Sequence, residues 1–307
     1  MSTGRLVLAG GSGFLGQCLA REYLDAGGEV DVLTRTPDAK ILGRPVAWDG
    51  ATVGDWARVL EGATAVVNFT GKSVNCRYTS ANSRAILESR LRPVESLGAA
   101  LTACSKPPPV WVQAASLAIY GNPGATICDE TAPPGSGFSV EVCQRWEEAF
   151  NGCEVSSTRK VLHRIGFVLG AGGGALEPLA RLAHLGLGGP AGSGRQYIPW
   201  LHVADLNRIL MWSIDSRDAG GTYNATGPTP VTNSEFMATL RRAVGRPWSP
   251  PVPAWMVRIG AWAIQTEPEL ILTGRRCVPR RLLEQRFTFR FPALDAALAD
   301  ILKSKAS

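Results

Sequence analysis

Short apolar runs alternate with longer segments of helical periodicity through the first two-thirds of the chain. Apolar runs of this length predict buried strands, and apolar residues that recur every three or four positions predict helices. Strand–helix alternation with short connections predicts an α/β fold, a Rossmann-type doubly wound parallel sheet with helices on both faces. The predicted strands cover residues 6–9, 30–34, 65–69, 110–114 and 161–168, and the predicted helices cover 14–26, 52–60, 80–104 and 140–150.

Two segments break this alternation. Residues 170–194 are rich in glycine around a predicted helix at 175–185, which indicates loops that border a ligand site. From about residue 233 the pattern is helical and interrupted by several prolines. We therefore predict a dinucleotide-binding domain over residues 1–232, with a glycine-rich insertion at 170–200, and a small, mostly helical C-terminal cap over 233–307.

A glycine turn follows the first predicted strand and opens the first predicted helix. Glycines at this spacing allow a tight turn, close approach of the backbone to a pyrophosphate and close packing of helix on strand. The helix N-terminus then offers free N–H groups to the anion. The turn therefore predicts a dinucleotide site that comprises Gly10, Gly11, Ser12, Gly13, Phe14, Leu15 and Gly16.

The second predicted strand ends in Thr34 and Arg35, at the sheet edge where such folds bind ligands. A NAD-specific site usually places an acidic residue there, whereas Asp31 lies near the start of the strand. The guanidinium of Arg35 can stack on the adenine and pair with a 2′-phosphate. We therefore predict NADP as the cofactor; the alternative is that Arg35 is a solvated surface residue.

Composition narrows the class of protein without changing this interpretation. The 307 residues are 45% hydrophobic and 19% charged, which is typical of a globular protein. The net charge of +6 comes from scattered arginines without a nucleic-acid-binding motif, so an anionic ligand is favoured over nucleic acid.

The cysteine pattern and the apolar segments indicate whether the protein binds a metal, spans a membrane or is secreted. The seven cysteines include no C-x-x-C pair, so neither a metal site nor a disulfide framework is indicated. The first predicted strand starts almost at residue 1, which leaves no room for a signal peptide, and the apolar segment 252–264 is too short to span a bilayer. We expect a cytoplasmic protein without a membrane partner.

Five further motifs carry a resemblance to the extended short-chain dehydrogenase/reductase superfamily, which includes nucleotide-sugar epimerases. They lie at residues 66–71, 114–121, 164–170, 200–205 and 223–227. The resemblance implies that Phe69, Thr70, Gly71 and Gly166 lie beside the cofactor and that Ser116 is the catalytic serine. It also implies an unidentified small-molecule substrate and a homodimer.

A narrower resemblance is to an atypical epimerase-family subgroup of SDR39U type, some of whose bacterial members are labelled cell-division inhibitors. It rests on residues 68–77, the Gly-Leu-Gly-Gly-Pro segment at 186–190, residues 278–282 and Phe291-Pro292. The resemblance implies the C-terminal domain of unknown function that is typical of this subgroup. The substrate of the subgroup is not established, so the resemblance implies a fold and a cofactor but no specific reaction.

The chain lacks the Tyr-x-x-x-Lys pair on which superfamily chemistry depends. None of its five tyrosines has a lysine four residues later, and the best register places Ser139 and Cys143 at the two positions. A serine hydroxyl is a poor acid–base group near neutral pH, and a cysteine carries no fixed positive charge. The family's active-site asparagine is replaced by Arg90.

Two functions remain open. In the first, the protein is an NADP-dependent oxidoreductase or epimerase-like enzyme: Ser116 binds the substrate oxygen, Tyr120 or a water relays the proton, and Arg90, with Arg77, supplies positive charge. Cys143 as a reactive thiol is a weaker alternative. In the second, the protein is a non-catalytic NADP-binding sensor with a link to cell division, in which cofactor binding orders the glycine-rich loops for a partner.

Several other residues have open interpretations. We expect His202 to be a structural histidine that pairs with Asp205 or with the backbone, and His163 to lie in a strand away from any metal. Trp255 and Trp262 are two helical turns apart and predict core or interface. Three sets of arginines either contact a ligand or are solvated: Arg195, Arg275-Arg276 and Arg280-Arg281.

Overall fold

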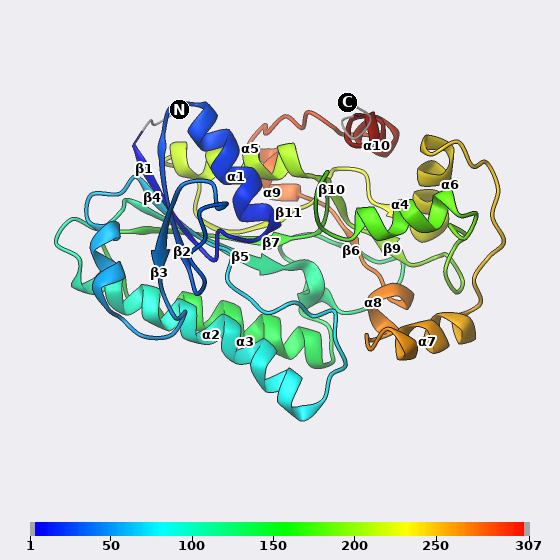
Figure 1. The fold of residues 1–307 in the computed structure, drawn as a ribbon, viewed down its shortest axis with the longest axis horizontal. Coiled ribbons are helices and arrows are strands. Elements are labelled where there is room, and N and C mark those ends of the chain that lie inside the picture. Colours follow the sequence, from blue (N-terminus) through cyan, green and yellow to red (C-terminus); the bar gives the residue numbers. More distant parts are fainter. Residues whose placement is uncertain (1–3, 304–307) are drawn as a thin grey trace.

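The centre of the protein is a seven-stranded parallel sheet (Figure 1). The computed structural model describes residues 4–303. The strand order is β3-β2-β1-β4-β5-β7-β11, so the chain begins in the middle of the sheet and winds outward in both directions. This confirms the doubly wound Rossmann-type fold. The strands are β1 (Arg5–Ala9), β2 (Glu29–Thr34), β3 (Arg44–Ala47), β4 (Ala65–Asn68), β5 (Val110–Ser116), β7 (Arg159–Ile165) and β11 (Gly221–Ala225).

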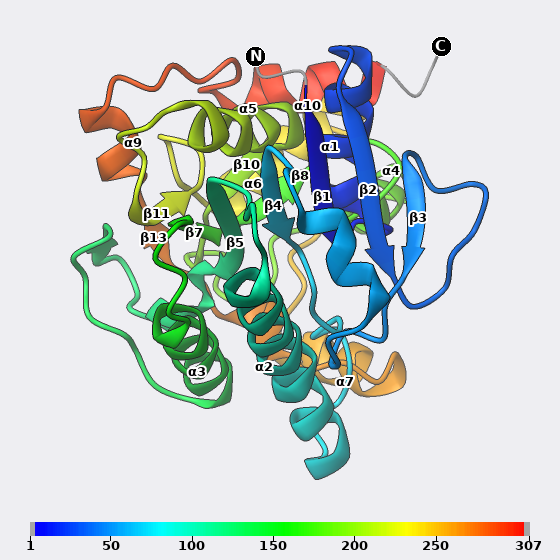
Figure 2. The same cartoon turned by 90° about the vertical axis from the view of Figure 1, so that its left-hand side faces the viewer.

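Helices cover both faces of the sheet (Figure 2). An apolar core lies on each face of the sheet, and alternate side chains of β1 point into the two cores. Leu6 and Leu8 pack under α1 and α5, whereas Val7 and Ala9 pack under α2 and α3. This alternation is the period of two that an extended strand imposes. The bounds of these helices are α1 (Phe14–Asp25), α2 (Ser80–Ala103), α3 (Phe138–Gly152) and α5 (Val203–Asp215).

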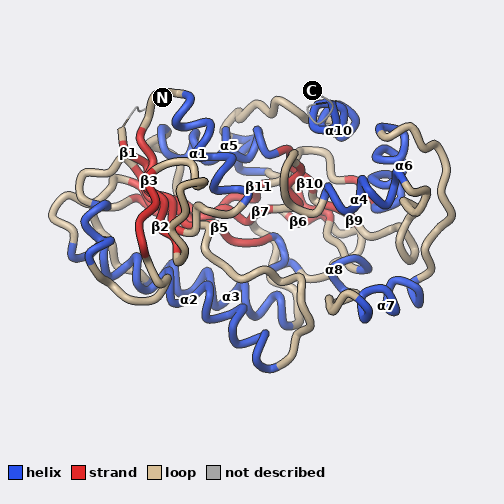
Figure 3. Tube along the Cα trace, viewed as in Figure 1, coloured by secondary structure: helices blue, strands red, loops and turns tan. Residues whose placement is uncertain are grey.

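A second group of elements lies beyond the carboxyl ends of the strands (Figure 3). Helices α4, α6 and α10 share a separate apolar cluster around Trp200 and Phe236. The remaining elements are η1 (Asp55–Leu60), η2 (Leu117–Tyr120), β6 (Ile127–Cys128), β8 (Phe167–Leu169), α4 (Leu176–His184), β9 (Tyr197–Ile198), β10 (Trp200–His202), β12 (Val231–Thr232), α6 (Asn233–Ala243), α7 (Ala254–Ala263), α8 (Glu269–Leu272), β13 (Arg276–Cys277), α9 (Arg280–Glu284) and α10 (Leu294–Lys303).

The last part of the chain returns from this group to the main sheet. Strand β13 pairs with β6, and Leu282 of α9 is fully buried in the same core as α1 and α5. The carboxylate of Asp205 accepts the backbone N–H groups of Arg290 and Phe291 at 2.7 and 2.9 Å. The division at residues 232 and 233 stays a prediction, but the C-terminal segment does more than cap the site.

The strand expected over residues 161–168 is interrupted at Gly166. The Cβ position of Gly166 lies 2.2 Å from the carbonyl oxygen of Pro199, so no side chain fits there. Beyond this glycine, β8 leaves the main sheet and pairs with β10. Strand β3 was not predicted, because its four residues include a proline and occupy a sheet edge.

Candidate cofactor and substrate site

The glycine turn between β1 and α1 has the backbone geometry that its sequence predicts. Gly10 has φ of 68°, which a residue with a side chain adopts only with strain. The Cβ position of Gly16 lies 2.4 Å from the Cα atom of Gly11, so the helix packs backbone against backbone on the turn. The Cβ position of Gly13 has no atom nearer than 3.9 Å. Gly13 therefore faces open space, whereas Gly16 is fully enclosed.

The N-terminus of α1 presents unpaired donors beside this turn. The first intrahelical hydrogen bond runs from the N–H of Gln17 to the carbonyl of Gly13, and Gly13 provides no side-chain cap. Within residues 4–303, no acceptor binds the backbone N–H groups of residues 12–16. These donors and the positive end of the helix fit the pyrophosphate of a dinucleotide.

The end of β2 adds a free cation to the site. Thr34 Oγ1 lies 3.2 Å from Ser12 Oγ, which joins the strand end to the turn. Arg35 is exposed and forms no ion pair with the acidic groups of residues 4–303. Asp31 instead accepts two 2.7 Å hydrogen bonds from Arg44. The carboxylate of Asp31 is therefore engaged away from the turn, and Arg35 is available to an anionic ligand.

Two contacts around this turn escaped the sequence analysis. The Gln17 amide donates to the carbonyl of Gly11 and accepts the N–H of Leu42, both at 2.8 Å, so it ties the loop after Arg35 to α1. The Cβ position of Gly173 lies 2.4 Å from the ring of Phe14, so the glycine-rich loop rests on that ring. A glutamine one turn into the helix is the only local signal for the first contact, and nothing local predicts the second.

The residues after β4 approach the glycine turn and α2. The N–H of Phe69 donates to the carbonyl of Ala9 at 2.8 Å. The backbone of Thr70 approaches within 3.0 Å of the Cβ position of Gly10, and Gly71 lies against the guanidinium of Arg90. The structure thus brings the end of β4, the glycine turn and α2 together.

Ser116 ends β5 with its side chain half-buried. Its oxygen accepts the N–H of Ala118 at 3.1 Å, which starts η2. In the described part of the chain the hydroxyl hydrogen of Ser116 has no acceptor, so it can donate to a ligand.

Tyr120 does not fit the role of proton relay that its sequence position favours. Its hydroxyl contacts the carbonyl of Asp129 at 2.8 Å and Asn224 Oδ1 at 2.9 Å, and it accepts from Arg164 at 2.7 Å. The side chain is 2% exposed, and burial raises the pKa of the phenol to about 12 in spite of Arg164. Its hydrogen-bonding capacity is used internally, so we withdraw it from the proposed catalytic set.

The two positions aligned with the family's Tyr-x-x-x-Lys pair lie on the first turns of α3. Cys143 is 4% exposed, and burial raises the pKa of its thiol to about 12 despite the nearby charge of Arg90. The thiol is therefore protonated near neutral pH, which argues against a reactive cysteine. Beside Ser139 lies the hydroxyl of Tyr78, whose ring packs on Phe138 with centroids 4.8 Å apart. Sequence analysis missed Tyr78 here because it comes from the loop before α2.

Arg90 occupies the inner face of the same region. Its Nη1 donates to the carbonyls of Ile86 at 2.9 Å and Lys72 at 3.2 Å, and its guanidinium lies 5.1 Å from the ring centroid of Trp146. Burial lowers the pKa of Arg90, although the group stays charged. The side chain supports the loop after β4 and keeps its charge without an acidic partner among residues 4–303.

The structure confirms the prediction for His202 and contradicts a core position for the two tryptophans. His202 caps α5 by accepting the N–H of Ala204 at 3.0 Å, which confirms a structural histidine; its other nitrogen lies 3.3 Å from Asp300 rather than near Asp205. Trp255 and Trp262 are 61% and 68% exposed, so the prediction of a core position is wrong for both.

Contacts and exposure place several other residues named in the sequence analysis. His163 lies in β7 and contacts Ser213 Oγ at 2.8 Å. Arg280 pairs with Asp129 and Glu284, and Arg195 is exposed. Residues 4–303 contain no cluster of side chains that fits a metal ion, and none of their helices is long and apolar enough to cross a bilayer.

Comparison with known proteins defines the family. The model of the NAD dependent epimerase/dehydratase family matches residues 6–226. The chain belongs to this family. A second model, a domain of unknown function (DUF1731), matches residues 252–301. The glycine turn, Ser116 and Arg90 all fall within the epimerase match.

Full-length relatives narrow the family assignment. The epimerase family protein SDR39U1 of Bos taurus is 33% identical to this epimerase-family chain over 97% of it and 99% of the relative. The human protein of that name is also 33% identical, over 97% and 99%. The recognised SDR39U-type resemblance and its C-terminal domain are therefore confirmed.

Solved structures agree with the fold. Human SDR39U1 (isoform 2) with NADPH has a TM-score of 0.87 at 32% identity, covering 97% of this chain and 99% of its own. A nucleoside-diphosphate sugar epimerase from Corynebacterium glutamicum has a TM-score of 0.79 at 26% identity, with 98% and 58% covered. A UDP-N-acetylglucosamine 4-epimerase from Bacillus cereus, at 15% identity and a TM-score of 0.77, shares the fold.

Proposed function

We propose that this epimerase-family protein binds NADP(H) and transfers hydride to or from an oxygen-bearing carbon of a small molecule. The observation that supports NADP as the cofactor is the position of Arg35. This free cation follows β2, beside the hydrogen bond between Ser12 and Thr34. A guanidinium there matches the 2′-phosphate, whereas a NAD site needs an acid. The human relative solved with NADPH supports the same preference.

The nicotinamide supplies or accepts the hydride when the cofactor is bound. The chain contributes the groups around it. The turn at residues 10–16 holds the pyrophosphate, and the free hydroxyl hydrogen of Ser116 binds the substrate oxygen. Because the Tyr120 phenol is buried and fully bonded, a water near Ser116 is the proposed proton relay.

A second function, a non-catalytic NADP sensor, is favoured by one observation. The positions of the family's acid–base pair hold Ser139 and a buried, protonated Cys143, while the cofactor turn is intact. In this alternative, cofactor binding acts through the glycine-rich loop, which rests on Phe14 of the turn.

Titration with NADPH and with NADH, followed by nicotinamide fluorescence, tests the cofactor. In Arg35→Ala the affinity for NADPH should fall at least tenfold, about 1.4 kcal/mol, with little change for NADH. Arg21→Ala, an exposed arginine of α1, is the control and should change neither affinity. Tighter binding of NADH than NADPH by the unaltered protein would exclude the proposed preference.

Deuteride transfer from labelled NADPH to a panel of carbonyl compounds, and hydride transfer to NADP from a panel of nucleotide sugars, separate enzyme from sensor. Ser116→Ala should reduce transfer on the order of 100-fold with unchanged NADPH affinity. Ser139→Ala and Tyr120→Phe should keep most of the activity. NADPH binding without transfer on any compound would favour the sensor.

A further inference from the structure

Two guanidinium groups near η2 and α3 lack a neutralising carboxylate among the described residues. Arg90 on α2 and Arg275 just before β13 form no ion pair with the acidic groups described in residues 4–303. Both side chains are removed from much of the solvent, and this burial lowers the pKa of each. A partly buried, unneutralised charge is unfavourable in the free protein. Two unneutralised positive charges of this kind are typical of a site that binds a negatively charged ligand.

Two of the three guanidinium nitrogens of Arg90 lack a hydrogen-bond acceptor among the described residues. Its Nη1 is occupied by the carbonyls of Ile86 and Lys72, but no acceptor within residues 4–303 binds its Nε or Nη2. The Cβ position of Gly71 lies 3.5 Å from Nη2, so a side chain at residue 71 would cover this nitrogen. The absence of a side chain at Gly71 thus leaves Nη2 accessible from the cofactor side.

The guanidinium of Arg275 reaches the same region from the C-terminal segment. Its Nε donates to the carbonyl of Gly121 at 3.0 Å, directly after η2, which Ser116 starts. Its two terminal nitrogens have no acceptor in the described part of the chain. The bond to Gly121 therefore holds the Arg275 side chain beside the end of η2, the short helix that Ser116 starts.

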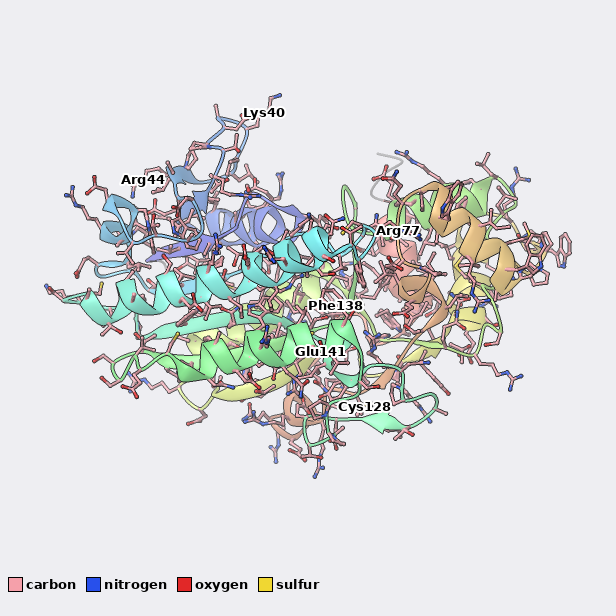
Figure 4. All side chains as sticks on the ribbon, turned by 90° about the horizontal axis from the view of Figure 1, so that it is seen from below. Lys40, Arg44, Arg77, Cys128, Phe138 and Glu141 are labelled. Carbon is pink, nitrogen blue, oxygen red and sulfur yellow. The ribbon has the colours of Figure 1, made fainter. Side chains whose placement is uncertain are left out.

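Cys143 lies within the electrostatic reach of both arginines. The positive charges of Arg90 and Arg275 each act on its thiol, which packs beside Tyr120 and Cys277. This is the position aligned with the family's lysine. Figure 4 shows Phe138, and Arg77 before α2, at the helix ends that face the C-terminal region. Positive charge from α2 and from the C-terminal segment thus acts at residue 143, the position aligned with the family's lysine.

The hydroxyl of Tyr78 is a further donor at this place. It is buried beside Ser139 without a well-formed hydrogen bond, and the charge of Arg90 lies close enough to interact with it. The carboxylates around Tyr78 and Cys143 are engaged or exposed: Glu147 binds both arms of Arg164 at 2.8 Å, Glu267 accepts the N–H of Tyr78 at 2.8 Å, and Glu141 and Glu269 are exposed. None of them pairs with Arg90 or Arg275 among residues 4–303.

We propose that Arg90 and Arg275 form a binding site for an oxyanion, a carboxylate or phosphate carried by the substrate, where the family keeps its Tyr–Lys pair. The site deepens the proposed function and rests on it, because the anion would hold the substrate beside Ser116. Guanidinium forks match both groups through paired N–H donors, with Tyr78 as an additional donor. The substrate is thus a small acid or a phosphate ester with an oxidisable or reducible carbon near its charged group.

The test measures anion binding to the full chain saturated with NADPH, which keeps the probes out of the cofactor's phosphate sites. Calorimetric titrations with malonate and with inorganic phosphate, at constant ionic strength in chloride, should show saturable binding of at least one of them. Arg275→Gln should weaken that binding at least tenfold, and Arg90→Gln should do the same. Malonate alone would assign a carboxylate, and phosphate alone a phosphate ester.

Two controls separate this site from general charge and from the cofactor. Arg258→Gln removes an exposed arginine of α7 and should leave anion binding unchanged. Arg90→Lys keeps the charge without the fork and should give intermediate affinity if Arg90→Gln fails to fold. Intact NADPH binding together with no anion binding, or with full binding in Arg275→Gln, would overturn the site and leave the cofactor proposal standing. Loss of NADPH binding by the unaltered chain would instead refute the proposed function.

Discussion

Gly13 and Gly16 lie on the same turn but differ in the space around them. An alanine methyl at residue 16 would meet the backbone of Gly11 at 2.4 Å, and backbone cannot yield as a flexible side chain can. Gly13 has φ of −80°, which alanine adopts freely, and its nearest contact is 3.9 Å away. Packing within the fold of the free protein therefore requires glycine at residue 16, whereas only a ligand that approaches from outside would require it at residue 13.

This difference predicts opposite effects of two alanine substitutions. Gly16→Ala should lower the free energy of unfolding by about 1–3 kcal/mol, measured by urea denaturation, because it overpacks helix on strand. Gly13→Ala should change it by less than about 0.5 kcal/mol. Gly13→Ala should nevertheless weaken NADPH binding at least tenfold, because its methyl group enters the space open to the pyrophosphate. Unchanged NADPH affinity in this variant would mean that the pyrophosphate lies elsewhere.

Residues whose role follows from their neighbours in sequence could be predicted, and those that depend on distant segments could not. The turn at residues 10–16 is local, so its spacing was sufficient. The role of Tyr120 depends on Asn224 and Arg164, which are 104 and 44 residues away, and the family motif gave no sign that both would bond its hydroxyl. Arg275 contacts Gly121 across 154 residues, so sequence left it undecided between a ligand contact and solvent.

At the scale of elements, the loop between β4 and α2 is held by the C-terminal segment. Asn75 Oδ1 accepts from Thr266 Oγ1 at 2.5 Å, and Glu267 accepts the N–H of Tyr78 at 2.8 Å. A pocket of about 450 Å³ lies between this loop and the end of α7 near Trp262. The position of Tyr78 beside Ser139 is therefore set by residues nearly 190 positions away.

Removing one of these contacts should loosen the loop without unfolding the protein. In Glu267→Ala the amide of Tyr78 should exchange with deuterium roughly fivefold faster, which corresponds to about 1 kcal/mol for one lost hydrogen bond. Glu269→Ala, an exposed glutamate on α8, is the matched control and should leave this rate unchanged. Exchange measured by mass spectrometry on peptides that cover residues 72–79 resolves the two variants; equal rates would show that the loop is ordered from within.

The hydrophobic pattern predicted a strand correctly wherever the strand is buried along nearly its whole length. β1, β2, β4 and β5 are buried nearly throughout, and their apolar runs identified all four. The break at Gly166 is set by the carbonyl of Pro199, a contact between segments that no local pattern encodes. The same limit applies to β13, which consists of two residues and exists through its pairing with β6.

At the scale of the whole molecule, the C-terminal segment joins the cofactor half to the second group of helices. α10 packs on α6 in one cluster, while Leu282 and Phe289 belong to the core beneath α1 and α5. The chain thus crosses from one group to the other and back. The homodimer and the cytoplasmic location stay predictions, and sedimentation of the NADPH-bound protein tests the first of them.

This arrangement predicts that the fold of the cofactor half depends on α9. Leu282 is fully buried and its neighbour Leu283 is 47% exposed, so the pair offers a matched comparison on one short helix. Leu282→Ala should lower the free energy of unfolding by about 2–5 kcal/mol, because it opens a cavity in the main core. Leu283→Ala should change it by less than about 0.5 kcal/mol.

A fragment of residues 1–232 lacks Leu282 altogether, so it should show no cooperative thermal transition and no NADPH fluorescence enhancement. If that fragment instead melted cooperatively and bound NADPH as tightly as the full chain, the first 232 residues would be an autonomous domain, and the packing of α9 would be dispensable for the cofactor site.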